Sequence, residues 1–149
     1  MTEQAAQETA QAMTAEEITI LLDDIFPQLN QGRRCYFIDW VKNREAVLRL
    51  KADERHLRPG GTVSGPTMMG LADFAAYVVI LAEIGPVALA VTTSLNINFL
   101  MKPAPGDMLA HVRTLKMGKR LVVVEVDMWS EGQEDLVAHA TATYSIPPQ

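Results

Sequence analysis

The spacing of hydrophobic residues changes along the chain, and each spacing predicts a different element. Between residues 18 and 29 the apolar positions recur every three or four residues, which is typical of an amphipathic helix. Thr14 and Glu17 have capping-box spacing at the head of this helix, and Pro27 disfavours its last turn. Six other segments are β-branched and aromatic or alternate with a period of two, which predicts strands. They are residues 34–41, 45–53, 89–100, 108–117, 121–129 and 136–146.

The segment from 89 to 100 alternates regularly enough to assign its two faces. One face has Thr93 together with Leu89, Val91, Leu95, Ile97 and Phe99, whereas Thr92 and Asn96 lie on the polar face. The turns that join the last strands are short, and short connections are typical of antiparallel pairing. We therefore expect an antiparallel sheet with one apolar face.

Residues 66–84 form a nearly continuous apolar run that contains an aspartate, Asp73. The run approaches the length of a membrane span, which needs roughly 20 apolar residues. An aspartate near the centre of a bilayer is costly, however, and no basic cluster flanks the run to set an orientation. A helix that is apolar on all sides in a soluble protein is a core helix, and this is the interpretation we adopt.

The ends of this helix are well marked. Ser64 or Gly65 suits the N-cap, and Pro66 suits the first helical position. Gly85, followed by a proline, ends the helix. The free N–H groups and the positive end of the helix dipole at its start favour negative charge there.

The predicted order is a helix, two strands, one long helix and four strands. The chain has one predicted sheet and one long apolar helix. The most apolar surface is buried when the sheet curls around this helix, so the predicted fold class is α+β. Residues 1–13 are polar and acidic and are predicted to be a disordered or frayed tail. Residues 14–149 are predicted to form a single domain.

Composition narrows the classes of function. The net charge is −5 and no basic run exceeds two residues, which disfavours nucleic-acid binding. The single cysteine, Cys35, cannot form an internal disulfide, and the sequence has no spacing typical of zinc ligands. The first residues lack the positive start and apolar block of a signal peptide. We expect a cytoplasmic protein that binds neither a metal nor a membrane.

Four stretches, taken together, match a known family. They are GGTVSGPTMMGLADFAAY, TTSLNINFLMKPAPGD, KMGKRLVVVEVDMW and LVAHATATY. From about residue 34 to 146 the sequence resembles the PaaI-like acyl-CoA thioesterases of the hot-dog fold. The resemblance implies a curved antiparallel sheet around the central helix, in homodimers that often pair into tetramers. It also implies an acyl-CoA substrate at the dimer interface, with no cofactor besides the coenzyme A of the substrate.

The resemblance assigns roles to three residues. The family's glycine matches Gly65, its acid eight residues later matches Asp73, and its serine or threonine on the next strand matches Thr92. The Gly65 N–H is then an oxyanion donor, Asp73 a general base or nucleophile, and Thr92 a group that orients water. Eight helical residues span about 12 Å, so we expect Gly65 of one chain to act with Asp73 of another. Without the resemblance, Asp73 also reads as a buried structural acid and Gly65 as a simple cap.

Three positions depart from the family pattern. The histidine before the glycine is Ser64, the second glycine is Pro66, and the polar residue six positions before the histidine is Arg58. Ser64 can still donate a hydrogen bond to a substrate carbonyl, and Arg58 can polarise that carbonyl or pair with Asp73. These departures favour a second hypothesis, a non-catalytic hot-dog protein that binds acyl-CoA or another apolar carboxylate.

Further candidates for substrate binding lie outside the helix start. Lys102, Lys119 and Arg120 fall in predicted turns, where they either pair with coenzyme A phosphates or remain solvated. Asn96, on the polar face of its strand, is a further candidate.

A dehydratase of the same fold is disfavoured by residue spacing. It would need a histidine acting with an acid on the central helix, and His56 does precede that helix. In the dehydratases, however, the acid falls five residues after the helix-start glycine, where this chain has Gly70.

Overall fold

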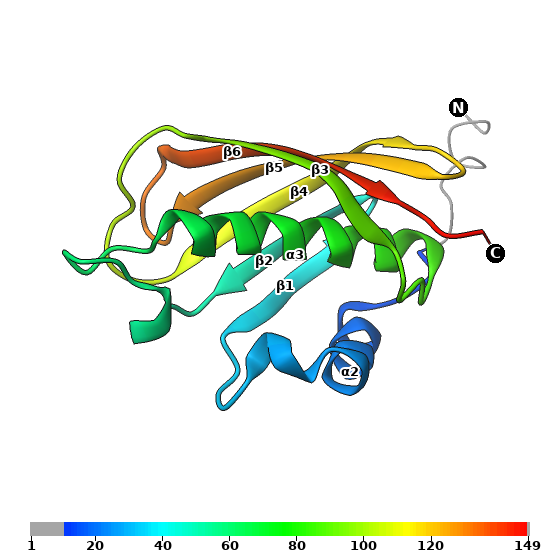
Figure 1. The fold of residues 1–149 in the computed structure, drawn as a ribbon, viewed down its shortest axis with the longest axis horizontal. Helices are drawn as coiled ribbons and strands as arrows, with labels where there is room; N and C mark the ends of the chain where they lie inside the picture. The colour runs from blue at the N-terminus through cyan, green and yellow to red at the C-terminus, as the bar shows by residue number, and fades with distance from the viewer. Residues whose placement is uncertain (1–10, 149) are drawn as a thin grey trace.

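One antiparallel sheet wraps around a long central helix in the computed structural model, which describes residues 11–148 (Figure 1). This is the predicted α+β hot-dog architecture, with a further helix near the N-terminus. The elements are α2 (Ala15–Ile25), η1 (Pro27–Asn30), β1 (Tyr36–Lys42), β2 (Glu45–Leu50), η2 (Glu54–His56), α3 (Gly65–Ile84), β3 (Val91–Phe99), β4 (Met108–Met117), β5 (Leu121–Ser130) and β6 (Leu136–Ser145).

The six strands pair in the order β1-β2-β4-β5-β6-β3, and every pairing is antiparallel. Strands β1 and β3 are therefore the two edges of the sheet. Along β2, β4, β5 and β6, alternate residues are buried against α3, as the period of two predicted. The side chains between them form the outer face of the sheet, on the side away from α3.

The central helix α3 is a core helix, as its continuous apolar sequence predicted. Its length and composition would also suit a membrane span, but 67% of the span-like window is buried inside the protein. The N-cap is Ser64, whose hydroxyl accepts a hydrogen bond from the Thr67 N–H. Gly85, at φ 99°, ends the helix in a conformation that suits glycine.

Helix α2 lies beside β1 and contacts α3 (Figure 1). Its start is the predicted capping box, in which the Glu17 N–H donates to the Thr14 hydroxyl and the Thr14 N–H donates to the Glu17 carboxylate. Ile18 and Leu22 are its buried residues, and the helix ends before the proline at position 27.

The segment before α2 is bound to the end of α3. The N–H groups of Ala12 and Met13 both donate to the Ala82 carbonyl, at 2.8 and 3.2 Å. The predicted tail of residues 1–13 lies mostly outside the described residues, which begin at residue 11.

A β-bulge in β3 corrects the predicted faces of that strand. Thr92 pairs with Tyr144, but Ser94 pairs with the adjacent Thr143, so one extra residue, Thr93, interrupts the register. The extra residue inverts the alternation. Thr92 therefore faces α3, together with Leu95 and the apolar residues that follow it, and the prediction that Thr92 lies on the opposite face was wrong.

Candidate active site

The carboxylate of Asp73 accepts two hydrogen bonds on the same oxygen. The Thr92 hydroxyl donates to Oδ1 at 2.5 Å, and the Tyr144 hydroxyl donates to Oδ1 at 2.8 Å. Oδ2 has no hydrogen-bond partner among residues 11–148, and no lysine, arginine or histidine in that range forms an ion pair with Asp73. The half-buried acid therefore keeps one oxygen available and has no cation to neutralise it.

Tyr144 is the residue of this group that the sequence did not single out. It lies on β6, directly opposite Thr92 of β3, and is 3% exposed. Burial raises the pKa of Tyr144 far above its ordinary value, so its hydroxyl remains a donor at physiological pH. The only sequence signal was a large polar aromatic at the end of an inward row of alanines, Ala138, Ala140 and Ala142.

The start of α3 leaves one N–H group free. The Thr67 N–H donates to the Ser64 hydroxyl, the Met68 N–H donates to the Ser64 carbonyl, and Pro66 has no N–H. In the described part of the chain, the Gly65 N–H has no hydrogen-bond partner. Pro66, which departs from the family pattern, thus leaves Gly65 as the one free donor of this first turn.

Gly65 is not required by packing within the protomer. A Cβ atom built on it would lie 3.5 Å from the ring of Phe99, which is an ordinary van der Waals contact. Its φ is not in the left-handed region, so another residue could adopt the same backbone. The absence of a side chain at this position therefore leaves space beside a free N–H, where a ligand oxygen can approach.

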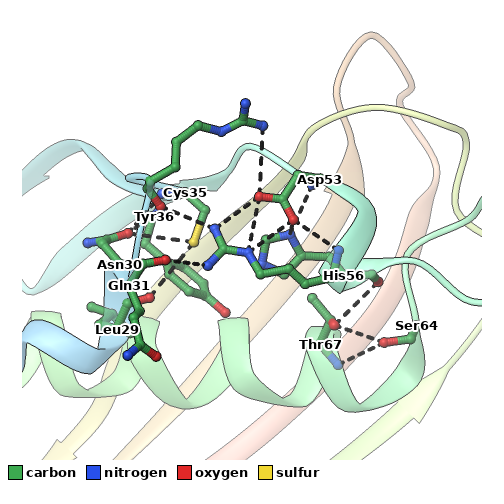
Figure 2. Close-up of polar contacts among 11 residues, drawn as sticks. Leu29, Asn30, Gln31, Cys35, Tyr36, Asp53, His56, Ser64 and Thr67 are labelled. Atoms are coloured by element: carbon green, nitrogen blue, oxygen red, sulfur yellow. Dashed lines mark hydrogen bonds and ion pairs between the residues drawn. The ribbon is translucent and has the colours of Figure 1, made fainter.

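His56 fixes the loop before α3. Its carbonyl accepts hydrogen bonds from the Ser64 N–H at 2.8 Å and from the Thr67 hydroxyl at 3.3 Å, as Figure 2 shows for Thr67. Its buried ring accepts a hydrogen bond from the Asp53 N–H at Nδ1, and burial lowers the pKa of His56. The ring makes an edge-on contact with Tyr36. His56 thus supports the helix start through its backbone, and its ring bonds to Asp53 rather than to Asp73.

Gly65 and Asp73 lie on the same exposed strip of α3 but on different turns. Eight residues separate them, or about 12 Å along the helix axis. Gly65 neighbours Phe99 at the end of β3, whereas Asp73 bonds to Thr92 near its beginning. One protomer does not bring the two groups to a single substrate atom.

The predicted substrate-binding cations are spread over the protomer. Lys102 lies near the start of β6, because the backbone N–H groups of the two residues before it donate to the Val137 carbonyl. Arg120 lies near the other end of β6, because its carbonyl accepts from the Ile146 N–H. Lys119 is next to Arg120 in the β4–β5 turn. The two groups of cations therefore lie at opposite ends of the sheet.

Arg58 and Asn96 are also separate from Asp73. Arg58 is exposed in the turn before α3, and its guanidinium forms no ion pair with any described residue, so the pairing with Asp73 considered from the sequence is not present. Asn96 pairs with Thr141 on the outer face of the sheet, on the side away from α3.

A surface pocket lies away from these residues. It is a small, open pocket where α2 and η1 meet β1 and α3. Its lining residues are Thr19, Leu22, Leu29, Asn30, Arg34, Tyr36, Ile38 and Phe74. Neither Gly65 nor Asp73 contributes to it.

A group of metal-ligand side chains on the outer face was missed by the sequence spacing. Ligand atoms of Glu125, Asp127 and His139 lie within 4.8 Å of one another, because β5 and β6 place these residues side by side. The Arg113 guanidinium already bonds both acids, at 3.2 Å to Glu125 and 3.3 Å to Asp127. The group is therefore explained as an ion-pair network.

Comparisons with known proteins agree with the fold and identify the family. Residues 60–137 match the family model described as the thioesterase superfamily. A protein of Pseudomonas aeruginosa, provisionally named an esterase, is 31% identical over 113 residues, which cover 75% of this chain and 83% of that protein. One of Saccharolobus solfataricus, also provisionally named an esterase, is 31% identical over 111 residues, covering 73% of each chain. The chain belongs to the thioesterase superfamily.

Solved structures give the same result. A crystal structure from Silicibacter sp. TM1040, provisionally named a thioesterase, has a TM-score of 0.86 and 45% identity, covering 95% of this chain and 97% of that one. The phenylacetic acid degradation protein PaaI of Thermus thermophilus has a TM-score of 0.68 and 23% identity, covering 81% of this chain and 99% of that one. The latter similarity supports the hot-dog fold alone.

Proposed function

We propose that the protein is a cytoplasmic acyl-CoA thioesterase whose active site is shared between two protomers. The observation that carries the proposal is the Asp73 carboxylate, which accepts from two neutral hydroxyl donors and has, among residues 11–148, no partner on its other oxygen and no cation beside it. A purely structural buried acid is usually neutralised by a cation or satisfied on both oxygens. Asp73 also occupies the position of the family's acid.

The geometry of β3 supports a shared site. β3 is an edge strand, and an edge with unpaired backbone groups is suited to pairing with a second copy. Antiparallel pairing of two β3 strands about a two-fold axis near Leu95 brings the end of one strand, by Phe99, to the beginning of the other, by Thr92. Gly65 of one protomer then approaches Asp73 of its partner. This use of the β3 edge also allows two such dimers to pair into a tetramer.

The edge also has the exposed apolar surface that such a contact would bury. Val91 is 57% and Phe99 49% exposed, and Met69 of α3 is 41% exposed on the helix strip that includes Asp73. Burying apolar area of this kind stabilises association by about 25 cal/mol per Å² before the costs of binding are counted.

In the general-base route, Asp73 Oδ2 takes a proton from a water molecule while the water oxygen attacks the thioester carbonyl carbon. The negative charge that develops on the carbonyl oxygen is stabilised by the Gly65 N–H of the other protomer. The Ser64 hydroxyl, a second candidate donor, would exchange its 2.8 Å bond with the Thr67 hydroxyl for this contact. Collapse breaks the C–S bond, and the coenzyme A thiolate takes the proton held by Asp73. The products are the carboxylic acid, which ionises in solution, and free coenzyme A, so the reaction consumes one water and needs no added cofactor.

In the nucleophilic route, Oδ2 attacks the carbonyl carbon directly and expels the thiolate, which is protonated by solvent. Water then hydrolyses the mixed anhydride. Multiple turnovers in ¹⁸O-labelled water, followed by mass spectrometry of the Asp73 peptide, test this route, because label in Asp73 would establish it. Only attack of water on the aspartyl carbon of the anhydride places label in Asp73.

The same pairing gives the scattered cations a common role. Lys102 lies near the end of β3, and Lys119 and Arg120 lie near the other end of the sheet. Antiparallel pairing of β3 brings Lys102 of one protomer toward the turn of Arg120 in the other. We assign these side chains, with Arg58 before α3, to the phosphates of coenzyme A, which cationic side chains bind by charge-assisted hydrogen bonds.

The test is a hydrolysis panel of aliphatic, hydroxylated and aromatic acyl-CoAs with detection of the free thiol. The wild type should release thiol, Asp73→Asn should lose at least about a hundredfold in kcat, and sedimentation should show a dimer or tetramer. No turnover across the panel, or full activity in Asp73→Asn, would contradict the proposal. Coenzyme A binding without turnover would instead support the non-catalytic hypothesis, and an active monomer would contradict the shared site.

A further inference from the structure

We infer that Tyr144 is a positioning residue for Asp73: it holds Oδ1 of the carboxylate and thereby makes Oδ2 the reacting oxygen. The inference rests on the proposed thioesterase function and adds to it a residue that the family pattern did not supply. It also states which of the two carboxylate oxygens reacts.

The Tyr144 hydroxyl bonds to Asp73 at two points. It lies 2.8 Å from Oδ1 and 3.0 Å from the backbone carbonyl oxygen of the same residue. A single O–H proton that is shared between these two acceptors ties the side chain of Asp73 to its own backbone. Rotation of the carboxylate would break this contact, so the hydroxyl restricts the carboxylate to one orientation.

The second donor strengthens the distinction between the two oxygens. The Thr92 hydroxyl also donates to Oδ1, and Thr92 is the direct cross-strand neighbour of Tyr144. With two donors directed at Oδ1, a proton arriving at the carboxylate is accommodated at Oδ2, because Oδ1 is already used as an acceptor. Oδ2 is therefore the oxygen that takes a proton from water or attacks the thioester carbonyl carbon.

Tyr144 is itself held firmly in place. Its backbone lies in β6 between β5 and β3, paired with Val122 on one side and Thr92 on the other. Its ring stacks on Tyr77 of α3, with centroids 6.2 Å apart and planes 19° apart. The Tyr77 hydroxyl donates to the Ala88 carbonyl at 2.8 Å, so this second tyrosine is anchored independently of Asp73. A donor on such a rigid support can define the orientation of the group it bonds.

Tyr77 therefore provides a matched control. Tyr144→Phe and Tyr77→Phe each remove one buried tyrosine hydroxyl and its O–H proton, and each keeps the stacked rings. Only Tyr144→Phe removes a donor to Asp73. A merely structural role of the hydroxyl would give both variants similar kinetics and similar shifts of the unfolding midpoint.

The experiment measures kcat and KM for the best acyl-CoA of the panel, together with thermal unfolding, in the wild type, Tyr144→Phe, Tyr77→Phe and Asp73→Asn. We expect Tyr144→Phe to lower kcat about tenfold, the lower end of the value of a hydrogen bond to a charged group, and to change KM less than about twofold. Tyr77→Phe should keep the wild-type kcat. Crystals of Tyr144→Phe should show the Asp73 carboxylate in more than one orientation, and those of Tyr77→Phe in one.

The outcomes separate this inference from the function on which it rests. Loss of activity in Asp73→Asn, with equal kcat in Tyr144→Phe and Tyr77→Phe, overturns the positioning role and leaves the thioesterase proposal standing. A fall in KM and kcat together in Tyr144→Phe, with the carboxylate still in one orientation, also overturns it. Full activity in Asp73→Asn overturns the proposed function itself, and the positioning role with it.

Discussion

Helix α3 has two carboxylates, and they are bound in different ways. Asp73, in the first half of the helix, and Glu83, near its end, each accept a threonine hydroxyl at 2.5 Å, from Thr92 and Thr114 respectively. The other oxygen of Glu83 faces the Arg44 guanidinium at 3.6 Å. The other oxygen of Asp73 faces no described donor, and its second contact is a further neutral hydroxyl on the oxygen already used.

The environment of Glu83 accounts for this difference. Its side chain is 11% exposed, and burial raises the pKa of Glu83, opposed by the Thr114 hydrogen bond and by Arg44. Arg44 reaches it from the tight β1–β2 turn, in which Asn43 and Arg44 both have positive φ. Glu83 thus joins the end of α3 to a hairpin and to β4, which is a structural role.

The comparison teaches that burial of an acid in an apolar helix does not by itself mark a site. The arrangement of its partners does. Where a donor binds one oxygen and a cation faces the other, as at Glu83, both oxygens have a partner within the protein. Where only neutral donors bind, and only one oxygen is used, as at Asp73, the charge and one oxygen remain available for reaction.

The largest expected effect comes from making the same chemical change at both acids. Asp73→Asn should lower kcat at least about a hundredfold, because it removes the base or nucleophile, whereas Glu83→Gln should keep the wild-type kcat. Both substitutions are isosteric and remove one negative charge. Thiol release at saturating acyl-CoA measures the difference, and equal losses in the two variants would show that the comparison has no functional meaning.

Substitution of the two threonines should have effects of intermediate size. The effect is on activity at Thr92 and on stability at Thr114. Thr92→Val should lower kcat roughly tenfold, because it removes a donor to the reacting carboxylate. Thr114→Val should leave kcat unchanged and lower the free energy of unfolding by about 1–2 kcal/mol, because Glu83 then loses a buried hydrogen bond. Activity assays and urea denaturation of both variants test this, and a loss of activity in Thr114→Val would contradict it.

The smallest expected effect is the dependence of stability on pH at Glu83. Since the pKa of Glu83 is raised in the folded state, the folded protein binds this proton more tightly than the unfolded chain. Its contribution to stability is therefore greatest at low pH and is lost as the pH rises from about 4.5, the ordinary value, through the raised pKa.

Glu83→Gln lacks this titration and provides the reference. At pH 7 the variant should be at least as stable as the wild type, within about 1 kcal/mol, because the exposed Arg44 contact contributes little. As the pH falls toward 4.5, the wild type should gain stability relative to the variant. Urea denaturation at four pH values gives stability as a function of pH for the wild type and the variant. Parallel curves would contradict a raised pKa at Glu83.

Much of the fold follows from local sequence. The capping box at Thr14, the ends of α3 and the alternation of the inner strands depend on neighbouring residues, and the structure confirms them. The family resemblance supplied Asp73, Gly65 and their spacing. Neither local signals nor the resemblance indicated Tyr144, because a tyrosine at the end of a strand has no distinctive spacing to an acid on a helix.

What the sequence by itself determined is the order of the elements, the helix ends and the acid inside an apolar helix, because these depend on periodicity and on caps within a few residues. Only the tertiary structure decided which face Thr92 occupies. The bulge at Thr93 arises from the register between β3 and β6, and it inverts an alternation that looked regular in one dimension. Tertiary contacts also decided the roles of the two acids of α3, since the partners of Asp73 and Glu83 come from strands distant in sequence.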